Sequence, residues 1–339
     1  MKNVLFNFEK FPLSVCTQVG PLTDREKLIA ARIEENEQGL INFLPYVDPR
    51  DIYLSQHNSS IGQTWQDHNR LFAEFVYESE KESVVDVGGG SGNIYKSYMN
   101  INPQVAWKVI DLNPAVEAEN VTVVKGLYEP SLINKNDTVI TSHFLEHVID
   151  LSTFLQELRE RKPRYHIFTL PNFVKYAQNN YAATIMFEHP HFLTEDYLDY
   201  ILAATGWEII EKKYYKDHSI FFKTKPSTPK QESKIFDCKQ HIVKFLDYMS
   251  SRVDSVRGKG PFYVFGAHFP YYYLLNLGIA EDQIVAVIDN DPAKQGRRMY
   301  GTNTPVISPT QLPAGANVFV EMGPYNEEIK KELLNVNFI

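Results

Sequence analysis

One acidic residue followed by alternating glycines is the pattern in this chain with the clearest chemical meaning. The segment 86–92 begins with Asp86, carries Gly88, Gly90 and Gly92 in strict alternation, and follows an apolar pair at 84 and 85. Glycine has no Cβ atom, so the backbone at such positions adopts positive φ and can approach a ligand closely. The pattern predicts a tight turn that leaves a strand, receives a ligand and opens a helix.

A second acid stands where a ribose could bind. Asp111 ends the apolar run 107–110, and Leu112 follows it in the same predicted site. A carboxylate at the end of the second strand can accept hydrogen bonds from both hydroxyls of a ribose. A strand, a glycine turn, a helix and a second strand ending in an acid describe half of a nucleotide-binding α/β sheet. We therefore expect an adenosine-containing ligand at these residues.

The spacing of the glycines separates two classes of adenosine cofactor. Dinucleotide enzymes use Gly-x-Gly-x-x-Gly, which rests a pyrophosphate on a helix N-terminus. Here the glycines alternate, and the carboxylate of Asp86 beside them would repel phosphates. It would suit a ligand that carries an ammonium and a sulfonium. The sequence therefore favours a positively charged, phosphate-free donor, while an NAD-dependent oxidoreductase stays open as a rival of another class.

Composition and charge argue against several classes of protein. The 339 residues are 43% apolar, enough for two packed domains, and a net charge of −8 without a basic stripe argues against nucleic acid as a partner. No apolar run reaches membrane-spanning length and the first residues lack the apolar core of a signal peptide, so we expect a cytoplasmic protein. Cys16 and Cys238 are too few for a four-cysteine zinc site and are expected to be reduced thiols.

The polar, proline-bearing segment 225–235 predicts a linker between two folded domains. The first domain is expected at 66–224. The segment before it, 1–65, is expected to be helical or irregular, because apolar residues in Asp24–Leu40 fall at roughly helical spacing. The second domain is expected at 236–339.

Strand and helix patterns alternate in the first domain. Such an alternation, closed by a hairpin, predicts an α/β fold with a mostly parallel sheet and one antiparallel edge. The expected helices are Gln66–Tyr77, Val148–Leu158 and Thr194–Ala204, and the expected strands are Val121–Val124, Thr138–Thr141, Tyr165–Thr169, Trp207–Tyr215 and Ser219–Thr224.

The second domain repeats this logic on a smaller scale. An apolar strand runs into Gly266, and the strand Ile284–Ile288 ends at Asp289, which predicts a small Rossmann-like α/β domain. Gly266 and Asp289 could bind a nucleotide, or Asp289 could only cap a turn. The aromatic run Phe269–Tyr273 could stack on a nucleobase or sugar, but core packing is the preferred interpretation.

The first glycine motif resembles motif I of class I S-adenosylmethionine-dependent methyltransferases, with Asp111 at their ribose-binding acid. The two halves together resemble the C-methyltransferases of nucleotide-linked deoxysugars, in which a second Rossmann-like domain follows the methyltransferase domain. Three stretches carry this resemblance: Tyr53–His68, Phe187–Thr194 and Gly266–Pro309. It implies S-adenosyl-L-methionine as cofactor and a small-molecule substrate, a nucleotide sugar, held between the two domains.

The resemblance also implies roles for single residues. Methyl transfer from a sulfonium to an acceptor that carries a proton requires a general base. By the resemblance His189 faces the substrate, its imidazole titrates near neutral pH, and Glu188 could orient it. Tyr53, His57 and Asn58 would form part of the wall around the acceptor, on the resemblance alone.

Residues that follow the fourth strand form another candidate group. His143 and Phe144 would contact the adenine or methionine part of the donor. His147 is the second candidate for the base, although residues that open a helix commonly only cap it. Displacement at a sulfonium needs no metal ion and the spacing of the histidines demands none, so no metal is expected, while a metal at His143, His147, His189 and His191 stays an open alternative.

Three departures from the family pattern leave the acceptor open. The N-terminal segment holds Cys16 alone and so cannot form the family's zinc module, Met186 stands where the family has a tyrosine, and the segment 217–219 replaces a Gly-Gly-Ser turn with Asp-His-Ser. The alternatives are C-methylation of a ketosugar, O-methylation of a sugar hydroxyl with the same donor, and a non-catalytic subunit that binds the cofactor or a sugar.

Overall fold

The computed structural model describes residues 3–14, 17–52, 62–230 and 233–339, so the predicted acceptor residues Tyr53, His57 and Asn58 lie outside the described part. The chain forms two compact units that are not sequential. One unit contains residues 46–172 and 190–236, and the other contains residues 1–45, 173–189 and 237–339. Among the described residues, no helix combines the length and the apolar character needed to cross a membrane.

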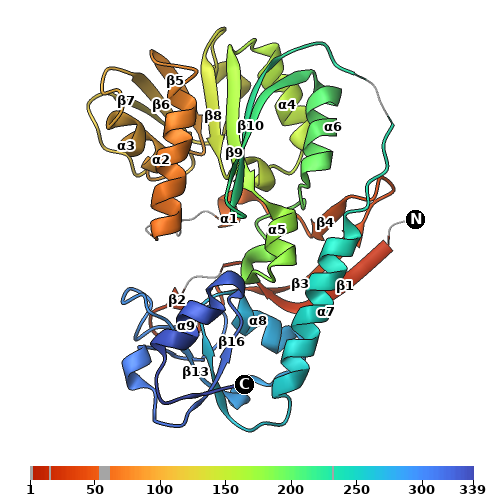
Figure 1. The fold of residues 1–339 in the computed structure, drawn as a ribbon, viewed down its shortest axis with the longest axis vertical. Helices are drawn as coiled ribbons and strands as arrows, with labels where there is room; N and C mark the ends of the chain where they lie inside the picture. Colours follow the sequence, from red (N-terminus) through yellow and green to blue (C-terminus); the bar gives the residue numbers. More distant parts are fainter. Residues whose placement is uncertain (1–2, 15–16, 53–61, 231–232) are drawn as a thin grey trace. The chain divides into compact units, whose positions relative to one another are not determined.

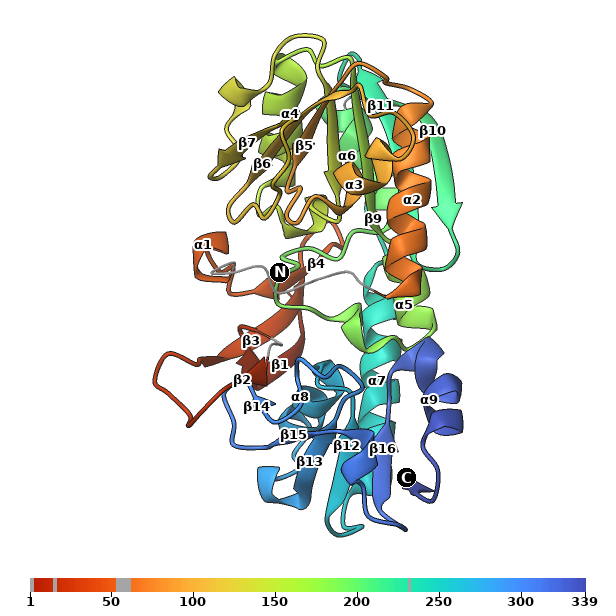
Figure 2. The same cartoon turned by 90° about the vertical axis from the view of Figure 1, so that its left-hand side faces the viewer.

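The unit 46–172 with 190–236 is built on a seven-stranded sheet (Figures 1 and 2). Its strands are paired in the order β10-β11-β9-β8-β5-β6-β7, and only the two pairings of β11 are antiparallel. The strands are β5 (Ser83–Val87), β6 (Ala106–Asp111), β7 (Val121–Lys125), β8 (Thr138–Ser142), β9 (Tyr165–Pro171), β10 (Trp207–Tyr215) and β11 (Ser219–Pro226). The predicted parallel sheet with one antiparallel edge is confirmed.

Helices cover both faces of this sheet (Figures 1 and 2). Successive strand residues point to opposite faces, so Val84 packs in one core and Val85 in the other. The first core also contains residues of α2 (Gln63–Tyr77) and α3 (Asn93–Met99), and the second contains residues of α4 (Leu151–Glu160) and α6 (Glu195–Thr205). A short helix, α1 (Pro49–Ile52), precedes them.

The ends of α6 follow the sequence signals. The side chain of Thr194 accepts a hydrogen bond from the backbone of Tyr197 and so caps the first turn. Gly206 ends the helix in the left-handed conformation, where a Cβ atom would meet Arg159 and the carbonyl of Ser227. The predicted start and end of this helix are both confirmed.

The N-terminal residues form strands, so the expectation of a helical or irregular segment is wrong there. The strands β1 (Asn3–Pro12), β3 (Leu28–Glu35) and β4 (Ile41–Leu44) make an antiparallel sheet in the order β1-β3-β4. In β3 the buried Ala31 and Ile33 alternate with the exposed Ala30 and Arg32. The apolar spacing of this short run fits the period of a helix as well as that of a strand. The run forms a strand because it pairs with β1, whose buried side chains lie beside its buried face.

The N-terminal sheet packs with the second domain in one unit. Phe11 of β1 stacks on Phe269 at a ring-centroid distance of 5.8 Å, and β2 (Thr17–Gln18) pairs with β14 (Arg298–Met299). The guanidinium of Arg298 forms an ion pair with Glu26 and hydrogen bonds to the carbonyls of Gly20 and Pro21. These contacts tie the start of the chain to its last hundred residues.

The second domain holds a five-stranded parallel sheet in the order β15-β13-β12-β16-β17. This is the predicted smaller Rossmann-like domain (Figure 2). Tyr271, Tyr272 and Tyr273 are at most 1% exposed, which confirms that the aromatic run packs in the core. Its strands are β12 (Phe262–Phe265), β13 (Ile284–Ile288), β15 (Val306–Ile307), β16 (Asn317–Val320) and β17 (Asn337–Phe338), and the helices of this unit are α5 (Phe173–Gln178), α7 (Lys239–Val256), α8 (Phe269–Asn276) and α9 (Asn326–Glu332).

Truncating a buried side chain of the large sheet should measure how much the core contributes to the free energy of unfolding. Phe168 is fully buried and stacks on Phe222 at a ring-centroid distance of 4.8 Å. Phe168→Ala should lower the free energy of unfolding by about 3–5 kcal/mol, because it removes buried apolar area and leaves a cavity. Urea unfolding followed by circular dichroism measures this. Val123→Ala on β7 is the control, since Val123 is 41% exposed and should change stability by less than about 0.5 kcal/mol.

Candidate functional site

The glycine turn after β5 has the conformation that the sequence predicts. Gly88, Gly90 and Gly92 have φ of 77°, 50° and 69°, all in the left-handed region. A Cβ atom would lie 2.5 Å from the ring of Phe144 at Gly88 and 2.5 Å from Val116 at Gly92. The turn therefore needs glycine both for its backbone and for its close neighbours. It lies where the strand order reverses between β6 and β8, which is where parallel α/β sheets bind ligands.

Asp111 is held against this turn by backbone donors. The N–H of Gly90 donates to Oδ2 at 2.9 Å, and the N–H of Asn113 donates to Oδ1 at 2.7 Å. A carboxylate oxygen can accept more than one hydrogen bond, so these two bonds are compatible with bonds from ribose hydroxyls. Leu112 follows in a half-buried bend. Asp111 is thus pre-oriented for the role that the sequence predicts for it.

Asp86 lies beneath the turn, where Gly89 passes over its carboxyl group. Its side chain is buried, and neither carboxyl oxygen has a hydrogen-bond partner among the described residues. Burial, together with the charge of Asp111, raises the pKa of Asp86 to about 7, and the side chain of Trp107 partly opposes this rise. A buried carboxyl without a donor is the environment that a cationic ligand can satisfy.

Phe144 and His143 leave β8 in different directions. Phe144 lies against Gly88, as expected for a wall of the donor site. His143 has φ of 48°, which is strained for a residue with a side chain, and its N–H donates to the carbonyl of Thr169 at 2.9 Å. Its ring joins a group of imidazoles that the sequence analysis did not identify. The predicted contact of His143 with the donor stays a prediction.

Four rings from distant parts of the sequence form this histidine cluster, which we define as Trp65, His68, His143 and His218. Trp65 contacts the other three rings at centroid distances of 4.7 to 5.4 Å. Burial lowers the pKa of His68 and His143 to about 3 and that of His218 to about 2, so all three are neutral at pH 7. The one sequence signal for the cluster was the Asp-His-Ser turn that replaces the family's Gly-Gly-Ser.

Two hydroxyls link the cluster to the sheet. Thr169 Oγ1 lies 3.1 Å from His68 Nε2. Ser219 Oγ, at the start of β11, lies 3.0 Å from His143 Nε2 and 2.6 Å from His218 Nδ1. The side chain of Ser219 therefore connects two of the imidazoles.

Glu146 and His147 lie on the short 3-10 helix η2 (Leu145–His147) that follows β8. Glu146 is buried, and burial raises its pKa to about 7, while the neighbouring His147 opposes this rise. Glu146 Oε1 lies 3.2 Å from His143 Nδ1, although neither oxygen of Glu146 has a hydrogen-bond donor among the described residues. That arrangement fits a neutral imidazole whose Nδ1 is an acceptor.

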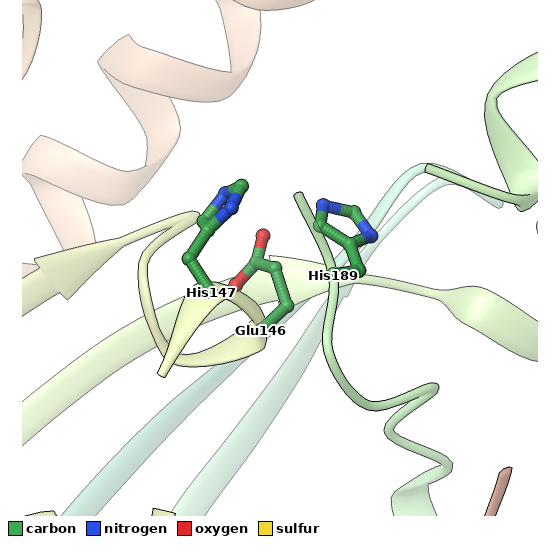
Figure 3. A group of neighbouring side chains, drawn as sticks. All are labelled: Glu146, His147 and His189. Atoms are coloured by element: carbon green, nitrogen blue, oxygen red, sulfur yellow. The ribbon is translucent and has the colours of Figure 1, made fainter. Parts of the chain in front are cut away.

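His189 ends a turn in which its N–H donates to the carbonyl of Met186 at 3.2 Å. Pro190 begins the next segment of the other unit, in which His191 donates from Nε2 to the carbonyl of Ile149 at 2.7 Å. Figure 3 shows the side chains of Glu146 and His147, from η2, and of His189, from the loop before Pro190. His147 and His189 both stay predicted bases, and the expectation of no metal ion also stays a prediction.

Glu188 belongs with the glycine turn of the second domain. It is buried, and its charge acts to raise the pKa of His268, which burial lowers to about 4. His268 Nδ1 is itself buried without a hydrogen-bond partner in the described part of the chain. These observations concern Glu188 and His268, so the role of Glu188 in orienting His189 stays a prediction.

The second glycine turn begins in the same way as the first. Gly266 has φ of 93°, and its N–H donates to the carbonyl of Ile288 at 2.7 Å, as that of Gly88 does to Ile110 at 2.8 Å. The N–H of Ala267 donates to Asp289 Oδ2 at 2.8 Å. Asp289 Oδ1 also accepts from the N–H of Asp291 at 2.9 Å, so Asp289 caps its own turn. Capping the turn does not prevent the same carboxylate from binding a nucleotide, so both interpretations of Asp289 stay open.

Comparison with protein families assigns both parts of the chain. Residues 60–212 match a family model described as a methyltransferase domain, and residues 217–333 match one described as a C-methyltransferase C-terminal domain. The first part is an S-adenosylmethionine-dependent methyltransferase domain. S-adenosyl-L-methionine is its methyl donor, and the donor-site residues Asp86 and Asp111 fit a cation that carries a ribose. The matches favour the methyltransferase over the NAD-dependent oxidoreductase.

The solved structures to which the chain is similar are distant from it in sequence. The pyocyanin biosynthetic protein PhzM is 17% identical over 47% of this chain and 55% of its own, with a TM-score of 0.38. An O-methyltransferase family protein from Burkholderia thailandensis is 12% identical over 48% and 56%, with a TM-score of 0.41. Magnesium protoporphyrin IX methyltransferase from Synechocystis is 17% identical over 54% and 91%, with a TM-score of 0.39. The chain spans about half the length of the first two, and no curated protein matches it.

Replacing Asp111 should weaken donor binding. Asp111→Asn turns one acceptor oxygen into a donor, so we expect the affinity for S-adenosylhomocysteine to fall about 10- to 100-fold, as for a lost hydrogen bond to a charged group. Isothermal titration calorimetry measures it. Asp289→Asn, the same change at the equivalent turn of the second domain, is the control and should leave this affinity unchanged. Equal affinity in Asp111→Asn and the unaltered protein would contradict the assignment.

Acid should destabilise the protein from about pH 6.5 downward. A histidine with a lowered pKa stabilises the fold above its unfolded pKa of 6.5, and this stability is lost as the pH falls toward the folded value. Asp86 and Glu146 oppose the trend, because their raised pKa values let the folded state bind protons between about pH 7 and 4. They are outnumbered by five buried or half-buried histidines whose pKa burial lowers: His68, His143, His166, His218 and His268.

Thermal unfolding between pH 7 and pH 4 measures this dependence. His166→Gln should make the decrease in Tm shallower, because His166 has a pKa lowered by burial to about 3 and the variant has no imidazole there to protonate. A Tm that rises as the pH falls from 6.5 to 4.5 would show that the two carboxyl groups dominate instead.

Proposed function

We propose that this chain transfers a methyl group from S-adenosyl-L-methionine to a carbon atom of a nucleotide-linked ketosugar, with His189 as the general base. The match of residues 217–333 to a C-methyltransferase C-terminal domain supports carbon as the methylated atom. The geometry of the second glycine turn supports a nucleotide-linked acceptor. That turn is the observation on which the choice of acceptor depends.

The two turns differ in the charge beneath them. The backbone pairing makes Gly266 equivalent to Gly88, so Val264 takes the position of Asp86. The position that Asp86 occupies under the first turn therefore carries no carboxylate in the second domain, so the repulsion of a phosphate by that residue is missing there. Lys294 adds a positive charge, with Nζ 3.1 Å from Asp289. The second turn thus suits a ligand with phosphates, whereas the first suits a cation.

The reaction needs a proton acceptor near the ketone. His189 would take a proton from the carbon next to the carbonyl, and the electron pair left behind would give an enolate. That carbon would then bond to the methyl group as the bond from the methyl group to sulfur breaks, with the electron pair going to sulfur. The bound donor supplies the methyl group and a neutral thioether as leaving group. An imidazole titrates close to neutral pH, which suits it to this step.

Replacement of His189 tests the base. His189→Gln keeps hydrogen-bonding capacity but cannot take up a proton, so turnover should fall at least about 100-fold while the affinity for S-adenosylhomocysteine stays unchanged. The assay uses methyl-labelled donor with a nucleotide-linked ketosugar and, separately, a plain sugar, and NMR locates the added carbon. His241→Gln, a half-buried histidine on α7 in the same unit, is the control and should keep full activity.

The position of the label decides between the alternatives. A methyl group on carbon supports the proposal, and a methyl group on oxygen would replace it with O-methylation by the same donor. Full turnover in His189→Gln would remove this residue as the base. A protein that binds the donor product but methylates neither acceptor would favour the non-catalytic subunit.

A further inference from the structure

We propose that Asp86 makes binding of the methyl donor release a proton, and that it thereby lets the site distinguish S-adenosyl-L-methionine from its demethylated product. The carboxyl group is partly protonated in the free protein and ionised in the donor complex. The inference uses the donor, which follows from the methyltransferase family match, and neither the acceptor nor His189 plays a part in it. Asp86, the glycine turn above it and Asp111 all belong to the unit 46–172 with 190–236.

Asp86 lies directly beneath the backbone of the glycine turn. It is the fourth residue of β5, and the turn that follows this strand passes over its side chain. A Cβ atom on Gly89 would lie 2.7 Å from Asp86 Oδ2, so only a glycine fits above the carboxyl group. Gly89 therefore adds no side chain that would hold a donor in the turn farther from this carboxyl group.

The surroundings of Asp86 disfavour its negative charge. In the register of the sheet Asp86 is paired with Val109 of β6 and Ile140 of β8, and both of these are fully buried. Neither carboxyl oxygen accepts a hydrogen bond from a described residue. Trp107 on β6 partly lowers the pKa of Asp86, although its indole N–H makes no hydrogen bond to the carboxyl group. Burial without a hydrogen-bond donor favours the protonated form of a carboxyl group.

Glu80 shows that burial alone does not decide the protonation of an acid in this unit. It precedes β5 and is 6% exposed, whereas Asp86 near the other end of this strand is 1% exposed. The carboxylate of Glu80 accepts hydrogen bonds from the backbone N–H groups of residues 81–83 and from the hydroxyl of Thr138. Burial acts to raise the pKa of Glu80, but these hydrogen bonds outweigh it and lower the pKa. Asp86 has the burial without such donors.

Asp111 adds a like charge beside Asp86. Burial raises the pKa of Asp86 to about 7, and the negative charge of Asp111, at the end of β6, contributes to this rise. The helices that cover this face of the sheet bury His68 on α2 and Tyr95 and Tyr98 on α3. Burial lowers the pKa of His68 to about 3 and raises that of Tyr98 to about 12, so neither of these two is charged at pH 7.

The donor and its product differ by one positive charge. The donor carries a sulfonium, which the reaction turns into a neutral thioether, and the amino-acid part and the adenosine are the same in both. A cation close to a buried carboxyl group lowers the pKa of that group, so the bound donor favours the ionised form of Asp86 more than the product does. Coupling between two binding equilibria is reciprocal, so ionised Asp86 must in turn favour the donor over the product.

Calorimetry on the whole protein counts the proton without any acceptor. Titrations with the donor at pH 6.5, in buffers of different ionisation enthalpy, should show about 0.7 proton released per donor bound, because a carboxyl group with a pKa of about 7 is largely protonated there. S-adenosylhomocysteine should release less. The affinity for the donor should increase about 10-fold from pH 5.5 to pH 7, a range in which the ammonium group of both ligands stays charged.

An isosteric variant assigns the proton to Asp86. Asp86→Asn has no carboxyl group to ionise, so the proton release should disappear. The variant should also lose at least about 10-fold more affinity for the donor than for S-adenosylhomocysteine, since a difference of one pKa unit corresponds to a factor of ten. Asp137→Asn is the matched control, because it makes the same change in the same unit just before β8, where Asp137 accepts from the N–H of Asn134. It should leave the proton count and both affinities unchanged.

Two results would overturn the proposal: the same proton count in Asp86→Asn and the unaltered protein, or an equal loss of affinity for donor and product. If Asp86→Asn does not fold by circular dichroism, Asp111→Asn decides in its place. Without the like charge Asp86 should ionise at lower pH, so the release at pH 6.5 should decrease, and an unchanged release would contradict the proposal. A protein that methylates no ketosugar would refute the acceptor in the proposed function and leave these binding results as they stand.

Discussion

The hydrogen bond from a glycine-turn N–H to the acid of the neighbouring strand is the constraint on which the rest of this structure depends. In the methyltransferase domain it joins Gly90 to Asp111, and in the second domain it joins Ala267 to Asp289. The two strands are parallel neighbours, so their carboxyl ends lie side by side. The bond holds the acid at the end of the second strand against the glycine turn that follows the first strand. The same kind of bond thus fixes an acid at the end of the second strand in each domain, although its donor is the third residue of the first turn and the second residue of the other.

Charge beneath the turn gives these two sites different chemistry. A buried carboxyl at Asp86 has no donor from the described residues, and an apolar Val264 stands at the matching place in the second domain, with Lys294 nearby. An uncompensated carboxyl favours a cation and opposes phosphate, and in the second domain the apolar Val264 exerts no such effect from the same position. The residue beneath the turn, Asp86 in the first domain and Val264 in the second, is therefore a main difference between two turns that begin in the same way.

Buried imidazoles are the third feature, and they follow from packing rather than from any motif. His68, His143 and His218 meet around Trp65 beside the ends of the strands β8, β9 and β11, where desolvation keeps the three rings uncharged. Neutral rings can be buried together because they do not repel one another as cations would. Glu146 beside them is held partly protonated by the same low polarity, so that one environment sets the protonation of both residue types.

The sequence by itself determined the elements that local signals specify. The alternating glycines and Gly206 act through their own backbone and Thr194 acts through a side chain that caps the turn next to it, so the glycine turn and the helix were predictable. Only the tertiary structure decided the N-terminal sheet, because the run 28–35 fits both periods until β1 pairs with it. It also decided the histidine cluster, since positions 68, 143 and 218 are brought together by the folded sheet and by no local pattern.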